Sequence, residues 1–212
     1  NEGLESIATR AFYGSHLEKV ELPASLKNCG SLCFSTVQRV IFNGDTLPKG
    51  FISAITLDEF DSNDGVEAVK VCLKDIDKTI YIPKQMSQIG IETAIFHLEG
   101  CSLAEADTYL FDSAYRFANV ADSAFLAAME ECFTNNNEEA KEFLKKNSTR
   151  IVDKLLEEED ESGLERISRL GVVSEEQLKR IGELAERKEW AALSAYVMNQ
   201  VDNSDDDDVF SL

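Results

Sequence analysis

Two pairs of side chains in this sequence have a spacing that suits metal chemistry. His97 and Cys101 are four positions apart, and residues at that spacing lie on one face of a helix, where they can share a zinc ion. Gly100 lies between them and ends the helical pattern, and no third ligand accompanies them. Cys29 and Cys33 have the same spacing, but both stand at apolar positions of a repeated motif, where free cysteine acts as a small hydrophobe. The pattern therefore predicts no metal site and no cofactor.

The segment from Asp61 to Glu67 has a composition similar to that of a calcium-binding loop. If Gly65 took the sixth position of such a loop, Phe60 would take the first, and its side chain cannot coordinate a cation. His16 lies in a predicted turn, and we expect a solvated loop residue rather than a general base. The sequence contains no phosphate-binding loop and no Gly-x-Ser-x-Gly or His-Glu-x-x-His motif. We therefore predict no catalytic residues and no enzymatic activity.

The sequence is strongly acidic, with 40 Asp and Glu residues against 21 Lys and Arg residues and a net charge of −19. The acidic excess is concentrated in the C-terminal half and includes the run Asp205 to Asp208. A chain of this charge is repelled by phosphate groups, so we expect no nucleic-acid partner and no binding to anionic membranes. The simplest interpretation of the excess is solubility.

The compartment is predicted from the apolar pattern and from the cysteines. No apolar run approaches the ~20 residues that a membrane span needs, and no signal peptide is recognisable. The first residue is Asn1 in the middle of a repeat, so we expect the sequence to be a fragment. Cysteines at apolar positions suit a reducing compartment, which predicts a cytoplasmic protein. The alternative is a cell-surface or secreted protein, if a missing N-terminal segment carries a signal peptide.

A short motif occurs twice near the start of the chain, at an interval of about 20 residues, which is typical of stacked coils. The first copy reads Leu4-x-x-Ile7-x-x-x-Ala11-Phe12 and then Leu17-x-x-Val20-x-Leu22-Pro23. The second reads Leu26-x-x-Cys29-x-x-x-Cys33-Phe34 and then Val37-x-x-Val40-x-Phe42. Val66-x-x-Val69-x-Val71 predicts a third coil, and Ile80-x-Ile82-Pro83 a closing strand. Phe12 and Phe34 hold equivalent positions, so we expect them to stack in the core.

The two copies resemble the leucine-rich repeats of the BspA-like type found in bacteria, most clearly over residues 3 to 42. The resemblance extends in a weaker form over residues 43 to 83. It implies coils stacked into a solenoid, with a surface that binds protein more often than it performs catalysis. Some members of this family are surface adhesins.

From Met86 onward the apolar pattern becomes helical. One helix is expected up to Gly100, a second from the cap Ser102, and a third over 122–133, broken by the segment 134–137. Further helices are expected over the ranges 138–146, 148–158, 162–170, 174–187 and 189–201. The fourth of these begins with a capping box, Ser174-Glu175-Glu176-Gln177.

The last helices carry a second resemblance. The sequence Leu184-Ala185-Glu186-Arg187-Lys188-Glu189-Trp190, followed by Leu193, Tyr196, Val197 and Met198, resembles an ankyrin-type helix–turn–helix. A related unit contains Leu155, Leu156, Gly163, Leu164, Ile167, Leu170 and Gly171. This resemblance implies ankyrin-like hairpins over about 138–201, which serve as interaction scaffolds. Trp190 stands at a predicted turn, where it either packs the hairpin or forms an exposed anchor for a partner.

These patterns predict an α+β fold in which a short leucine-rich-repeat-type β-solenoid packs against an all-α helical-hairpin domain. We expect the repeat coils to cover residues 1–83 and the helical, ankyrin-like domain to cover residues 84–201. The segment 202–212 is expected to be a disordered acidic tail, because successive aspartates repel one another and bury nothing.

Strict alternation along the strands places several side chains on the outer face of the predicted sheet. These are Lys19, Glu21, Arg39, Ile41 and Lys70. The pattern predicts that Lys19 lies opposite Arg39 and that Lys70 lies diagonally, level with Glu21 and Ile41. With Trp190, these residues form the candidate interaction surface.

The basic side chains on this face have two interpretations. Glu18, Glu21 and Glu67 neutralise them, or the face receives an acidic segment, such as Asp205 to Asp208 of another copy. The predicted function is protein–protein interaction or scaffolding, and the partner and the oligomeric state stay open. One alternative is a surface adhesin that binds a host protein or glycan. The other is an enzyme whose site lies in a missing N-terminal region or between the two halves.

Overall fold

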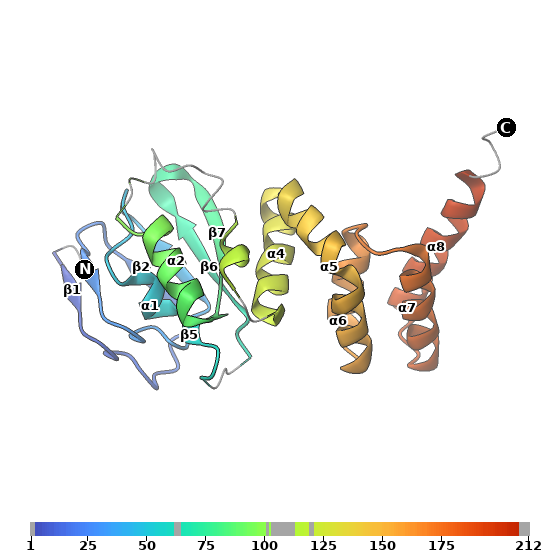
Figure 1. Cartoon of the computed structure of the whole chain (residues 1–212), viewed down its shortest axis with the longest axis horizontal. Coiled ribbons are helices and arrows are strands. Elements are labelled where there is room, and N and C mark those ends of the chain that lie inside the picture. Colours follow the sequence, from blue (N-terminus) through green and yellow to red (C-terminus); the bar gives the residue numbers. More distant parts are fainter. Residues whose placement is uncertain (1–2, 62–64, 101, 103–112, 119–120, 208–212) are drawn as a thin grey trace. The chain divides into compact units, whose positions relative to one another are not determined.

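The computed structural model describes residues 3–61, 65–100, 102, 113–118 and 121–207. The chain divides into two compact units, Asn1–Asn137 and Glu138–Leu212 (Figure 1). The sequence pattern placed this division at residue 84. In the structure the first unit also includes helix α2, Gln88–Leu98, and helix α4, Ala121–Asn135, which packs beside the sheet.

The first unit is built around a four-stranded sheet with the order β2-β4-β6-β7. Its strands are β2, Lys19–Leu22; β4, Arg39–Phe42; β6, Ala68–Leu73; and β7, Lys78–Pro83. The pairs β2–β4 and β4–β6 are parallel, whereas β6 and β7 form an antiparallel pair. The 3-10 turn η1, Lys74–Ile76, and the left-handed Asp77, with a φ of 48°, reverse the chain between these last two strands.

Two smaller parallel pairs accompany the main sheet. Strand β1, Ser6–Ile7, pairs with β3, Asn28–Cys29. Strand β5, Leu57–Asp58, pairs with β8, Gln85–Met86.

The prediction of a leucine-rich-repeat-type β-solenoid is wrong. The fold is a mixed α/β arrangement of helices and small sheets, and no solenoid is present among the residues that the structure describes. Two of the sheets are pairs of two-residue strands, and the main sheet ends in the antiparallel β6–β7 hairpin. A solenoid needs every coil to add another parallel strand, and a hairpin reverses the chain after a tight turn.

The inner face of the main sheet forms the core of the first unit. Val40 and Phe42 on β4 and Val71 on β6 are fully buried. Helices α1, Phe51–Ile55, and α2 contribute further apolar side chains to the same cluster. The alternation predicted for β2, β4 and β6 is confirmed on this inner face.

The stacking of Phe12 on Phe34 is confirmed, with ring centroids 5.6 Å apart and an interplanar angle of 8°. Only Phe34 belongs to the core, since 1% of it is exposed, whereas 43% of Phe12 is exposed. The equivalence of the two positions therefore predicted their contact and not their burial.

The elements that join the sheet to the helices follow local signals. The hydroxyl of Ser87 accepts a hydrogen bond from the N–H of Gly90 and caps α2. The helix ends at Leu98, just before Gly100 with a φ of 73°. The helix predicted after Ser102 lies in residues 103–112, outside the described part, and the 3-10 turn η2, Ala114–Phe117, precedes α4.

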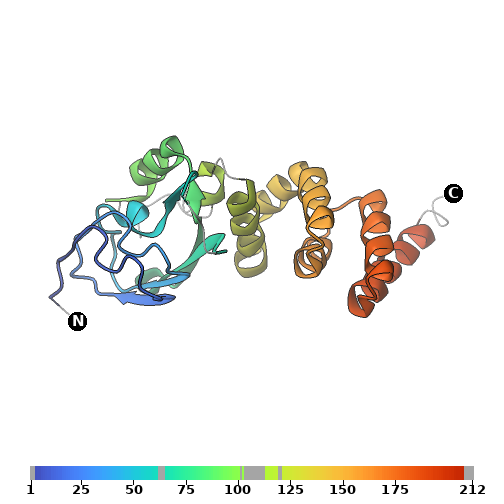
Figure 2. The same cartoon turned by 90° about the horizontal axis from the view of Figure 1, so that it is seen from below.

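The second unit consists of helices that pack in pairs, α5 with α6 and α7 with α8 (Figure 2). Their bounds are Glu138–Glu157 for α5, Glu161–Arg169 for α6, Glu175–Arg187 for α7 and Ala191–Asp207 for α8. The predicted capping box of α7 is confirmed, because Ser174 and Gln177 exchange hydrogen bonds between side chain and backbone.

Two predictions for this unit differ from the structure. The helices expected over 138–146 and 148–158 are one continuous helix, in which the Asn147 amide donates to the carbonyl of Phe143 and does not break the turn. Helix α8 continues to Asp207, so the segment 202–207 is helical rather than a disordered tail. Residues 208–212 lie outside the described part.

Candidate interaction surface

Three basic side chains form one row across the main sheet. Lys19 on β2 pairs with Arg39 on β4, and Arg39 pairs with Lys70 on β6. The predicted diagonal position of Lys70 is wrong, because Val71, rather than Val69, pairs with Val40. Neighbouring strands are about 4.8 Å apart, so the three side chains stand directly beside one another. We call Lys19, Arg39 and Lys70 the basic row.

The basic row is accessible, and no carboxylate within the described ranges forms an ion pair with it. Lys19 and Arg39 are exposed, and Lys70 is half-buried. The Nζ of Lys70 lies 5.6 Å from the centre of the Tyr81 ring, a cation–π distance. The hydroxyl of Tyr81 in turn contacts Thr134 Oγ1 at 2.7 Å. The β6 end of the row is therefore held in place.

Two of the three acidic residues expected to neutralise the row, Glu21 and Glu67, have other partners. Glu21 accepts hydrogen bonds from Lys74 Nζ at 2.7 Å and Asn43 Nδ2 at 3.0 Å. Lys74 first, then Asn43, holds the pKa of Glu21 below its usual value, and the charge of Lys19 is a smaller cause. Glu67 accepts a hydrogen bond from the Ser123 hydroxyl at 3.2 Å. The carboxylates of Glu21 and Glu67 therefore interact mainly with residues outside the basic row.

The next position along the strands forms a second row of Glu21, Ile41 and Cys72. Ile41 was expected to face solvent, but only 8% of it is exposed. Alternation thus predicted its side of the sheet and not its burial. Ile41 is a packing residue of the outer face and offers little surface to a partner.

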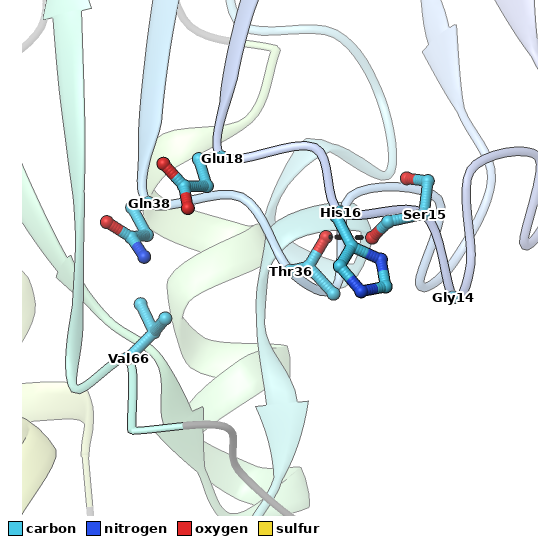
Figure 3. Close-up of a pocket in the computed structure, with 7 residues that line it drawn as sticks. All are labelled: Gly14, Ser15, His16, Glu18, Thr36, Gln38 and Val66. Carbon is cyan, nitrogen blue, oxygen red and sulfur yellow. Dashed lines mark hydrogen bonds between the residues drawn. The ribbon is translucent and has the colours of Figure 1, made fainter.

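An open pocket of about 380 Å³ lies where the chain enters the main sheet (Figure 3). The pocket is lined by residues of three segments, which precede β2, β4 and β6. These residues are Gly14, Ser15, His16 and Glu18; Thr36 and Gln38; and Val66. Figure 3 shows Glu18 and Gln38 together on one side and the His16 imidazole beside Thr36 on the other. Glu18 and Gln38 immediately precede Lys19 and Arg39, so the pocket adjoins the strands that carry the basic row.

The pocket is shaped by a hydrogen bond between two turns. The hydroxyl of Thr36 donates to the carbonyl of Ser15 at 2.9 Å, with a second contact to the carbonyl of Leu17 at 3.2 Å. The expectation that His16 is an exposed loop residue is confirmed. No sequence pattern predicted this pocket, although the polar residues Glu18 and Gln38 at equivalent positions were a usable signal.

Within the described ranges, the candidate metal ligands do not form a metal site. His97 stacks on Phe117 at 5.9 Å, and Cys101 lies outside the described residues. Cys29 and Cys33 are buried, and their mutual hydrogen bond, followed by burial, raises the pKa of Cys29. Across the described ranges, no three His, Cys, Asp or Glu side chains are placed to hold a metal ion.

The calcium-loop candidate lies only partly within the described residues. Residues 62–64 of the loop are outside the described part, and the carboxylate of Asp61 accepts a hydrogen bond from the N–H of Asp58 at 3.3 Å.

Trp190 stands between α7 and α8 in the second unit and is partly buried. Its backbone N–H donates to the carbonyl of Ala185 at 2.9 Å. These features place Trp190 in the turn of a helical pair.

None of the helices in the described ranges has both the length and the apolar character needed to cross a membrane. Comparisons of this chain with protein-family models, with curated proteins and with solved structures find no match. Its function must therefore be inferred from the side chains themselves.

Proposed function

We propose that the chain is a protein-binding module with no catalytic activity of its own, and that the basic row binds an acidic segment of a protein partner. The observation that carries this proposal is the direct register of Lys19, Arg39 and Lys70 on three neighbouring strands. Like charges opposite one another on adjacent strands are unfavourable, and an anionic partner removes this repulsion. The row is also an exception in a chain of net charge −19.

The spacing of the row suits closely spaced carboxylates. The three positions lie about 4.8 Å apart across the strands. Acidic side chains one turn apart on a helix are separated by about 5–6 Å, and alternate residues of a strand by about 6.6 Å. A short run of Asp or Glu therefore places two or three carboxylates over the row in either conformation. Lys70 is already held on the ring of Tyr81, which reduces the entropy lost on binding.

An acidic protein segment suits this surface better than a nucleic acid. A nucleic acid carries a long array of phosphates, and the net charge of −19 repels such an array at a distance. A short acidic segment needs only the local field of three cations. Salt bridges at an exposed face are screened by ions, so binding should weaken as the salt concentration rises.

The proposal is tested with a fluorescent peptide of residues 202–212 of this chain, which contains Asp205 to Asp208. Fluorescence anisotropy measures its binding to the full chain and to the Arg39→Glu and Lys70→Glu variants. Each variant should weaken binding by about tenfold or more, because a loss of about 1.4 kcal/mol corresponds to a factor of ten. Lys145→Glu is the matched control, since it makes the same charge change at an exposed position of α5.

A second peptide, with asparagine in place of Asp205 to Asp208, separates charge from other contacts. It should bind much more weakly than the acidic peptide. Equal binding of the two peptides would contradict the proposal. So would an equal loss of affinity in Lys145→Glu, which would indicate general repulsion, or no binding of the acidic peptide at millimolar concentration.

A further inference from the structure

The open pocket next to the basic row contains a carboxylate whose charge is not neutralised by the described residues. Glu18 lines this pocket and is exposed. Within the described ranges, no Lys or Arg side chain forms an ion pair with Glu18, and no hydrogen bond reaches its carboxylate. None of the described residues that line the pocket is Lys or Arg. The pocket therefore carries a negative formal charge, although it adjoins the three cations of the basic row.

Backbone hydrogen bonds hold Glu18 and Gln38 in register with the basic row. The carbonyl of Glu18 accepts hydrogen bonds from the N–H groups of Gln38 at 2.8 Å and Arg39 at 3.0 Å. The carbonyl of Gln38 accepts one from the N–H of Lys70 at 2.9 Å. Consecutive Cα atoms are about 3.8 Å apart, so Glu18 and Gln38 each stand one residue away from a member of the row. A segment bound across the row therefore comes within one or two of its own residues of the pocket.

This arrangement is unfavourable for a segment that carries acidic residues alone. Its carboxylates are attracted by the basic row, but they are repelled by Glu18 at the neighbouring position. A cation placed next to the acidic run removes this repulsion and gives Glu18 an opposite charge. The two adjacent surfaces, one basic and one acidic, thus favour a partner segment in which both signs of charge stand next to each other.

We propose that the pocket binds an arginine side chain that adjoins the acidic run of the partner segment, an inference that rests on the proposed function of the basic row. A guanidinium group can donate two parallel hydrogen bonds to a carboxylate, here that of Glu18. The side-chain carbonyl of Gln38 accepts a further N–H. Val66 contacts the aliphatic stem, which arginine buries against apolar surface. Figure 3 shows Gln38 between Glu18 and Val66, so the charged head and the apolar stem each meet a matching side chain.

The hydroxyl groups of the pocket also suit a cation better than an anion. The hydroxyl of Thr36 donates to the carbonyl of Ser15 at 2.9 Å, and the hydroxyl of Ser15 donates to the carbonyl of Phe12 at 2.6 Å. Both protons are used inside the protein, so these oxygens offer acceptors rather than donors to a ligand. An organic cation also fits better than a metal ion, because no three ligating side chains converge in the described part of the chain.

Fluorescence anisotropy with altered forms of the 202–212 peptide tests this pocket. The changes Ser204→Arg and Val209→Arg place an arginine directly before or directly after Asp205 to Asp208. One of these two peptides, depending on the direction in which the segment lies, should bind the full chain about fivefold more tightly than the unaltered peptide, which corresponds to about 1 kcal/mol.

The variant Glu18→Gln should abolish this gain. It should also strengthen the binding of the unaltered peptide, because the repulsion from Glu18 is removed. Glu183→Gln is the matched control, since it removes the same charge at an exposed position of α7, and it should keep the full gain. Effects of net charge cancel when two peptides are compared on two chains, so the cycle isolates the contact between Glu18 and the arginine.

The outcomes separate this pocket from the basic row. If the unaltered peptide binds and neither arginine peptide gains affinity, or if the gain persists in Glu18→Gln, the arginine pocket is wrong and the basic row stands. If none of the three peptides binds, both proposals fail. Peptides with lysine in place of the arginine should gain less, because an ammonium group cannot donate two parallel hydrogen bonds to a carboxylate. An equal gain with lysine would overturn the assignment to arginine.

Discussion

The carboxylate of Glu131 accepts a hydrogen bond from the backbone N–H of Tyr81 at 2.7 Å, although none of the Glu131 residue is exposed to solvent. One turn further along α4, Asn135 donates to the carbonyl of Thr79 at 2.8 Å and also to Glu131. Residues four apart on a helix are about 5–6 Å apart, close to the rise of about 6.6 Å over two strand residues. The helix thus supplies the donors and acceptors that another strand would supply.

The first prediction concerns this closure of the β7 edge. Glu131→Ala should lower the free energy of unfolding by about 3 kcal/mol, because it leaves the buried N–H of Tyr81 without its acceptor. Hydrogen exchange of the Tyr81 amide should accelerate markedly. Far-UV circular dichroism in urea measures the stability, since the single tryptophan, Trp190, lies in the other unit. Glu92→Ala, at an exposed position of α2, is the control, and an equal effect of the two changes would contradict the prediction.

The second prediction concerns Glu99 and pH. Its carboxylate accepts hydrogen bonds from the N–H groups of Gly50 and Ile52, both at 2.8 Å, and so caps α1. Burial raises the pKa of Glu99 above its usual value of 4.5, despite these two donors. The Glu99 carboxyl group therefore stays protonated up to a higher pH in the folded chain than in the unfolded chain. The resulting stability is fully present below about pH 4.5 and is lost as the pH rises through the folded pKa.

Glu99→Gln removes this titration and keeps a side chain that can accept a hydrogen bond. The difference in urea midpoint between the wild type and this variant should change in favour of the variant as the pH rises from about 4 to about 7. A difference that stays constant over this range would show that Glu99 does not titrate with a raised pKa.

The third prediction concerns a buried lysine. Only 1% of Lys84 is exposed, and its Nζ donates to the carbonyl of Ile55 at 2.7 Å and to that of Val37 at 3.3 Å. Lys84→Met keeps most of the volume and removes the donor, so it should destabilise the first unit by about 2–3 kcal/mol. Lys49→Met, at an exposed position, should change the unfolding midpoint little. A Lys84→Met variant as stable as the wild type would mean that the ammonium group does not stabilise these carbonyls.

The fourth prediction separates the two stacked phenylalanines. Phe34→Ala should cost about 3–5 kcal/mol, because it leaves a cavity in the core. Phe12→Ala should cost only about 1 kcal/mol, close to the value of an aromatic pair, because much of its ring is already exposed. Chemical unfolding of the two variants gives the comparison. Equal losses would show that both rings are buried in solution.

The sequence by itself determined the features that depend on local period and local chemistry. Alternation along β2, β4 and β6 identified which side chains face the core, because successive residues of any strand point to opposite faces. The capping box at Ser174 and the end of α2 before Gly100 were predictable for the same reason. Each depends on a few neighbouring residues whose backbone and side chains satisfy one another.

Only the tertiary structure decided which distant residues meet. The pairing of Arg39 with Lys70 depends on the path of the segment 43–65, whose turn residues do not determine a register. The position of helix α4 at the β7 edge depends on contacts between residues 50 apart in the sequence, such as that between the Tyr81 N–H and the Glu131 carboxylate. The energy of such contacts appears only after the chain has closed those loops, so no short pattern carries their signal. For this reason a repeated motif predicted the inward-facing residues correctly and the architecture incorrectly.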